Sequence, residues 1–230
     1  MPKHERAGRP ALTAEGIVAA AVAVADREGL AGVSMRSVGR ELGVEAMSLY
    51  HHVASKEALV DAMVDRLMSQ VVAPAPAAGW REGMLARVRS LRAAVGAHPW
   101  GLSVIGSRRA PGAAFLAHYE AVLDCLRRAG FSVALAGHAF SVLDAYVYGF
   151  VLTEQQLPFE PGDAQAMTDG LALAAQTHPR MVEFVESMIV GRDYDYGAVE
   201  FEWGLELVLD GLEARLAAES AAASADLPSP

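Results

Sequence analysis

The residues best suited to chemistry lie in one short stretch near the amino end of the chain. Met47, Ser48, Tyr50 and His51 follow closely after a glycine, Gly43. Hydroxyl and imidazole groups can hydrogen-bond phosphates or base edges, and an apolar side chain can contact a thymine methyl group. These residue types suit a helix that reads duplex DNA. They also suit an ordinary amphipathic helix of an all-α protein, so both interpretations stay open at this point.

Two short helices must position these side chains. The spacing of apolar residues predicts one helix over 34–42, with Ser34 as its N-cap, and a second over 45–51. Gly43 lies in the turn between them and suits a backbone position with positive φ. Two helices joined by a short turn that contains glycine have the layout of a helix-turn-helix.

The rest of the chain is also patterned as helices. Apolar spacing and punctuating Gly and Pro residues predict further helices over 13–29, 55–72, 80–97, 111–129, 132–156, 163–177, 179–190 and 195–219. No alternation of period two favours strands. The proline-rich segment 74–79 is the best boundary, so we expect an all-α chain with a head (residues 1–72), a body (80–219) and a frayed tail (220–230).

Charge is distributed unevenly along the 230 residues, whose net charge is −9. Residues 1–56 carry seven Lys or Arg against six Asp or Glu, which gives +1. Residues 57–230 carry 12 against 22, which gives −10. A mildly basic head on an acidic body is compatible with local DNA binding.

Several functional classes are disfavoured. The single cysteine, Cys125, excludes a disulfide within the chain and nearly excludes a cysteine-based metal site. No nucleophile–base, zinc-protease or phosphate-loop motif occurs, so we expect no catalysis, no cofactor and no metal. No signal-like start and no run of about 18 apolar residues occurs, which predicts a cytoplasmic protein without a membrane partner.

Residues 8–63 resemble the TetR family of transcriptional regulators, and the stretch LGVEAMSLYHHVASKEALVDA (42–62) is similar to the tetracycline-repressor branch. The stretch FEWGLELVLDGLEARL (201–216) is similar to that branch's final bundle helix. The resemblance implies a three-helix DNA-binding head and a helical body that binds a small effector and forms a homodimer. It also implies a palindromic operator in double-stranded DNA.

DNA contacts are expected from positions that match the family motif and from residue type. Lys56 begins a predicted helix, where the positive helix end favours a phosphate. Ala46 lies at the position where the tetracycline-repressor branch often has a polar residue that contacts a base. We therefore expect the operator sequence to differ from a tetracycline operator. The expected DNA-contacting residues are Arg36, Met47, Ser48, Tyr50, His51, His52 and Lys56.

Effector-binding residues are expected on the apolar faces of the body. His118 and Asp144 stand out because a polar group on an apolar face often fixes the orientation of a ligand. The main candidates, each of which also fits a plain core position, are Trp100, Ile105, His118, Tyr119, Phe140, Asp144 and Tyr148. The branch's metal-binding histidine is replaced by Val104 or Ile105, so we expect a moderately apolar effector rather than magnesium–tetracycline.

Two apolar stripes suggest how the body assembles. The stripes within 140–151 and 201–216 predict two helices that face their copies in a dimer, although such stripes can also be buried within one monomer. The leading hypothesis is a ligand-responsive repressor. The alternatives are an activator of the same family and an all-α small-molecule-binding protein whose function does not involve DNA.

Overall fold

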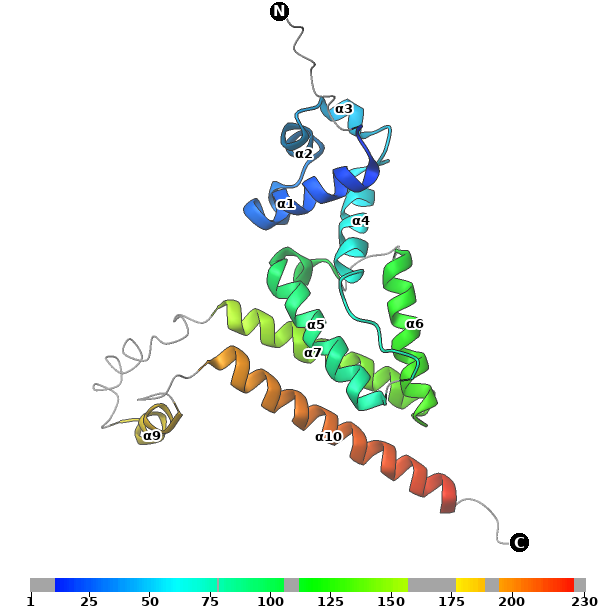
Figure 1. Cartoon of the computed structure of the whole chain (residues 1–230). Helices are drawn as coiled ribbons and strands as arrows, with labels where there is room; N and C mark the ends of the chain where they lie inside the picture. The colour runs from blue at the N-terminus through cyan, green and yellow to red at the C-terminus, as the bar shows by residue number, and fades with distance from the viewer. Residues whose placement is uncertain (1–10, 78, 106–111, 157–176, 189–194, 226–230) are drawn as a thin grey trace, which may run out of the picture. The chain divides into compact units, whose positions relative to one another are not determined.

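The structure, a computed structural model, describes residues 11–77, 79–105, 112–156, 177–188 and 195–225. These residues form helices and no strand, as the sequence predicts. They divide into two compact units (Figure 1): the first unit holds residues 1–73 and 89–121, and the second holds 74–88 and 122–230. The helix predicted over 163–177 lies almost entirely outside the described residues.

Four helices form the head part of the first unit. They are α1 (Ala14–Gly32), α2 (Met35–Leu42), α3 (Ala46–Leu49) and α4 (Lys56–Met68). Three of them begin at the predicted caps, because the side chains of Thr13, Ser34 and Ser55 each accept a backbone N–H three residues later. Such caps satisfy backbone donors that the first helical turn leaves without a partner.

The turn between α2 and α3 depends on two glycines. Gly43 adopts the left-handed conformation, with φ 61° and ψ 38°, as predicted. Gly39 lies where a Cβ would approach the carbonyl oxygen of Val44 to 2.9 Å, closer than real Cβ contacts. The two helices therefore pack with their backbones close together, and Val38 and Leu49 are fully buried beside them.

Two helix ends in the head differ from the sequence prediction. Gly29 has φ 71°, so the regular part of α1 stops where predicted, but a further short turn continues to Gly32. The fourth helix ends at Met68 and not at Val72. The hydroxyl of Ser69 donates to the carbonyl of Arg66 at 2.6 Å, and such local bonding competes with helix continuation.

The first unit also contains the carboxyl half of α5 (Trp80–Ala97) and the amino half of α6 (Ala113–Arg128). Between them lies a short 3₁₀ helix, η1 (Pro99–Ser103), which the sequence reading missed. Proline occupies its first position, where the missing N–H has no cost.

The second unit is built around α7 (Val133–Gln155) and α10 (Tyr196–Ala225), which lie side by side (Figure 1). The rings of Phe150 and Phe201 meet edge to face between them, with centroids 5.0 Å apart. α7 alone among the described helices is long and apolar enough to cross a bilayer, but Leu143, Val147 and Phe150 on it are buried within the unit. Within the most apolar window of α7, 39% of the residues are buried, and one such helix is weak evidence for a membrane span.

The carboxyl end of the chain is more helical than expected. α10 continues to Ala225, whereas the sequence predicts a helix end at 219 and a frayed tail from Ser220. The segment 217–225 is rich in alanine, the residue with the highest helix propensity, and this accounts for the extension. A further short helix, α9 (Pro179–Met188), belongs to the same unit.

Candidate nucleic-acid interface and effector site

The outer surface of α3 carries the predicted DNA-reading side chains. Leu49 is fully buried and anchors the helix, whereas Met47 is 72% exposed and Tyr50 is 46% exposed. Ser48 is half-buried, and His51 and His52 are exposed in the turn that follows. Because one residue points inward and its neighbours point outward, this short helix can place its outer side chains against the edges of a DNA groove.

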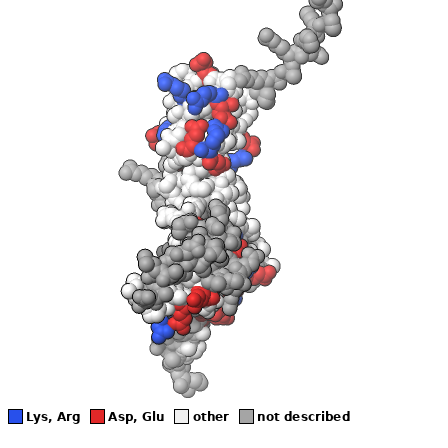
Figure 2. Space-filling view, turned by 90° about the vertical axis from the view of Figure 1, so that its left-hand side faces the viewer, with Lys and Arg blue, Asp and Glu red and all other residues white. Residues whose placement is uncertain are grey.

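Two cations flank α3. Arg36 is exposed in the first turn of α2, and Lys56 is exposed at the first position of α4. Figure 2 shows Lys and Arg side chains near the upper end of the molecule in that view, interspersed with Asp and Glu. This mixed surface matches the small positive charge of residues 1–56 and leaves cations available for phosphate contacts.

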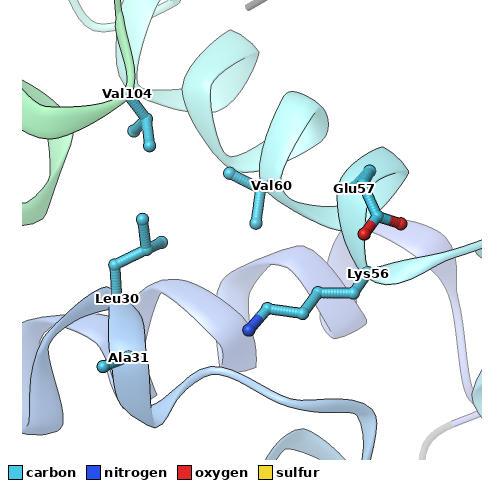
Figure 3. Close-up of a pocket in the computed structure, with 6 residues that line it drawn as sticks. All are labelled: Leu30, Ala31, Lys56, Glu57, Val60 and Val104. Atoms are coloured by element: carbon cyan, nitrogen blue, oxygen red, sulfur yellow. The ribbon is translucent and has the colours of Figure 1, made fainter. Parts of the chain in front are cut away.

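The side chain of Lys56 extends across the mouth of a cavity of about 320 Å³ (Figure 3). The cavity is lined by Leu30, Ala31, Lys56, Glu57, Val60 and Val104. Leu30 and Ala31, near the carboxyl end of α1, line the same cavity as Lys56. Since a lysine stem has four rotatable bonds, the ammonium group of Lys56 can turn outward to a phosphate without moving the backbone.

A buried charged cluster lies in the second unit. Arg87 on α5 is only 1% exposed, and its Nη2 lies 2.5 Å from Oδ1 of Asp144 on α7. The hydroxyl of Tyr148 donates to Oδ2 of the same carboxylate at 3.3 Å. The Arg87 guanidinium also lies over the ring of Phe140, 4.7 Å from its centroid. The structure thus brings together three of the predicted effector-binding residues.

Burial raises the pKa of both acidic side chains in this cluster. It raises the pKa of Asp144 above its ordinary value, even though the positive charge of Arg87 acts in the opposite direction. Burial also raises the pKa of Tyr148, and the negative charge of Asp144 adds to that rise. Desolvation therefore outweighs the attraction of Arg87 at Asp144.

Arg87 is the functional candidate that sequence reasoning missed. It lies on the same helical face as Met84, Val88 and Leu91, all fully buried. An arginine within a buried apolar stripe was a visible signal, because a charged residue is rarely buried without a partner. The matching signal on α7 was the spacing of Phe140, Asp144 and Tyr148, four residues apart on one face.

The other four effector candidates belong to the first unit. Trp100 is 6% exposed, and its indole N–H donates to Oδ1 of Asp26 at 2.7 Å. Ile105 and His118 are buried, and Tyr119 stacks on Phe115 with ring centroids 6.2 Å apart. Their roles as effector contacts stay predictions.

A helix-turn-helix with an exposed recognition helix, followed by a second helical unit, defines a class of DNA-binding proteins. The family described as "Bacterial regulatory proteins, tetR family" matches residues 17–63, and "Tetracyclin repressor-like, C-terminal domain" matches residues 73–216. The chain therefore belongs to the TetR family of transcriptional regulators.

Relatives of known type agree with this membership. The chain is 36% identical over 227 residues to the HTH-type transcriptional repressor DrrR1 of Streptomyces coeruleorubidus, covering 94% of this chain and 82% of that protein. ActR of Streptomyces coelicolor, solved in complex with actinorhodin, superposes with a TM-score of 0.72 at 28% identity, covering 90% of this chain and 99% of ActR. BioQ bound to its double-stranded DNA operator gives a TM-score of 0.60 at 26% identity, covering 89% of this chain and 99% of BioQ.

No three His, Cys, Asp or Glu side chains within the described ranges gather closely enough to hold a metal ion.

Proposed function

We propose that this protein is a cytoplasmic, ligand-responsive transcriptional repressor. It acts by binding DNA and a small effector and catalyses no reaction. In this proposal a homodimer binds a palindromic operator, and a small, moderately apolar effector releases it. The observation that carries the proposal is the exposed α3 surface with Met47 and Tyr50, held on a glycine turn in a chain of the TetR family. The repressor names of its relatives favour repression over activation.

The apolar stripes that the sequence predicts for the dimer, with Leu143 on α7 and Leu205 on α10, are buried within the second unit, so they do not face a copy of the chain. Homodimer formation is supported instead by other apolar side chains that these two helices expose. Val199, Trp203 and Leu207 recur every four residues on α10, and all are about half exposed or more. Val133, Val142 and Leu152 are similarly exposed on α7. Large exposed apolar patches mark interaction sites. A two-fold dimer built on these helices presents two heads, as a palindromic operator requires.

Effector binding is assigned to the cluster of Arg87, Phe140, Asp144 and Tyr148. A buried ion pair is weak evidence for stability, because apolar residues of similar volume often serve the fold as well. A polar cluster retained inside an apolar unit suits a second purpose, namely orienting a mostly apolar ligand through a few directed hydrogen bonds. If the effector has a higher affinity for an arrangement of the dimer that does not fit the operator, its binding shifts the population away from the operator-binding state.

Operator binding is tested directly by gel shift with DNA fragments that flank the gene for this protein. We expect at least one fragment to shift at low salt and the footprint to be palindromic. A reporter driven by the same fragment distinguishes repression from activation. Failure of every flanking fragment to shift at low salt would contradict the DNA-binding proposal.

Lys56→Ala should weaken binding to specific and random DNA by a similar factor. Removing one phosphate contact reduces the slope of log affinity against log salt by about 1 and leaves sequence preference unchanged. The measurement is the dissociation constant on both DNAs at several salt concentrations. Lys56→Arg, which keeps the charge, is the control. An unchanged salt slope in the alanine variant would remove Lys56 from the DNA interface.

Tyr148→Phe should weaken the response to effector. A panel of moderately apolar compounds is screened for release of labelled operator, and active compounds are retested on the variant. Loss of the hydroxyl should raise the concentration for half-release by about 10-fold, the cost of one hydrogen bond at a charged group. The matched control is Tyr146→Phe on the same helix, whose hydroxyl donates to the carbonyl of Phe201. Equal responses in the two variants would argue against the assigned site.

A further inference from the structure

A polar link joins the first helix of the head to the segment that follows α5. Oδ1 of Asp26 accepts the indole N–H of Trp100 at 2.7 Å and lies 2.8 Å from Nδ1 of His98. Asp26 is in α1, whereas His98 precedes η1 and Trp100 belongs to it. The three residues lie in the same compact unit although more than seventy positions separate Asp26 from the other two.

The short helix η1 also packs tightly on α4. A Cβ at Gly101 would lie 2.6 Å from Cδ1 of Leu67, so the backbone of η1 touches an α4 side chain directly. The hydroxyl of Ser103 donates to the carbonyl of Trp100 and closes the turn. η1 therefore contacts α4 by packing and α1 through the Asp26 carboxylate.

Apolar packing does not fill the remainder of this junction. The cavity of about 320 Å³ in Figure 3 opens among Leu30 and Ala31 of α1, Val60 of α4 and Val104 just after η1. Close packing normally resists the displacement of one helix on another. Where a cavity replaces it, directed hydrogen bonds have the larger share in fixing the angle between α1 and η1.

The charge on Asp26 strengthens this link. Its side chain is 34% exposed, and hydrogen bonds to a carboxylate are shorter and stronger than those between neutral groups. Trp100 is buried, so its N–H needs an acceptor within the protein. The adjacent Arg27 pairs with Glu41 of α2 at 2.9 Å, which ties α1 to the helix-turn-helix. α1 packs on α2, and α2 packs on the recognition helix α3, so the three helices are in contact in series.

We propose that Asp26 is a positioning residue for DNA binding, which holds the recognition helix at the angle the operator requires by bonding to Trp100 and His98. The proposal rests on the proposed function, since it presumes that the head binds DNA. Asp26 itself need not touch DNA. Its loss should loosen the angle of the head and so reduce both operator affinity and the ability to discriminate operator spacing.

The test compares the footprinted operator with the same operator lengthened by one base pair at its centre. Asp26→Ala and Trp100→Phe should weaken binding to the first by about 10-fold, the cost of a hydrogen bond to a charged group. Asp26→Asn, whose amide oxygen still accepts one hydrogen bond, should lose less operator affinity than Asp26→Ala. In all three variants the affinity ratio between the two operators should fall at least about threefold, because a loosened head tolerates altered spacing.

Trp80→Phe is the matched control, since it makes the same substitution in the second unit, where Trp80 packs edge to face on Phe131. It should leave the ratio unchanged. Hydrogen exchange of the free protein supplies a readout that does not need DNA: the amides of α1 should exchange faster in Asp26→Ala than in wild type. Unchanged exchange in α1, or an unchanged operator ratio in Asp26→Ala, overturns the positioning role. A wild type that binds no fragment overturns the DNA-binding function instead.

Discussion

Asp144→Ala should lower the free energy of unfolding by about 3–5 kcal/mol, because it leaves the buried Arg87 guanidinium without its carboxylate. Arg87 is 1% exposed and the side chain of Asp144 is 16% exposed, so water cannot replace the lost partner. For a chain of this length the loss corresponds to a fall in Tm of roughly 6–20 °C. Thermal and urea unfolding followed by circular dichroism measure it.

A second aspartate provides the matched control. Asp210 pairs with Arg81 at 2.6 Å, but its side chain is 67% exposed. Asp210→Ala should therefore cost about 1 kcal/mol or less, as is usual for surface pairs. Replacing Arg87 and Asp144 together by leucine should restore much of the stability lost in Asp144→Ala, since the buried cation is removed together with its carboxylate. Equal losses in the two alanine variants would contradict the burial of this pair.

Leu207→Asp should separate the homodimer and abolish specific operator binding. Leu207 is 58% exposed on α10, so the change costs the isolated subunit little. In a two-fold dimer each substitution occurs twice, and burial of two carboxylates at about 3 kcal/mol each raises the dimer dissociation constant roughly 10⁴-fold. Sedimentation velocity measures the oligomeric state, and fluorescence polarisation measures operator affinity.

Leu116→Asp makes the same substitution at a leucine that is 54% exposed on α6, in the first unit. It should leave both the oligomeric state and operator binding close to wild type. If Leu207→Asp remains dimeric, the exposed faces of α7 and α10 are not the dimer interface, and the exposed α10 stripe needs another explanation.

The helix-turn-helix was predictable from sequence because its determinants are local. The caps at Ser34 and Ser55 act within one helical turn, and Gly43 is required by the backbone angle of its own position. The inward position of Leu49 follows from helical spacing. The same reasoning failed at Ser69, where α4 ends although the apolar pattern continues to Val72.

The body was less predictable, since an apolar stripe does not identify what it packs against. Sequence could place Phe140, Asp144 and Tyr148 on one face of a helix. It could not show that Arg87, more than fifty residues earlier, meets that face. It also could not show whether the apolar stripe of α10 that contains Leu205 packs within one subunit, as it does, or against a second copy of the chain.

The sequence by itself therefore determined the class of fold, the position of the recognition helix and the family, because these depend on short-range spacing and backbone preference. Only the tertiary structure revealed the Arg87–Asp144 pair, the link from Asp26 to Trp100 and the exposed stripe of α10. Each depends on which distant segments come together. That choice is set by the packing of whole helices, and no local pattern of residues records it.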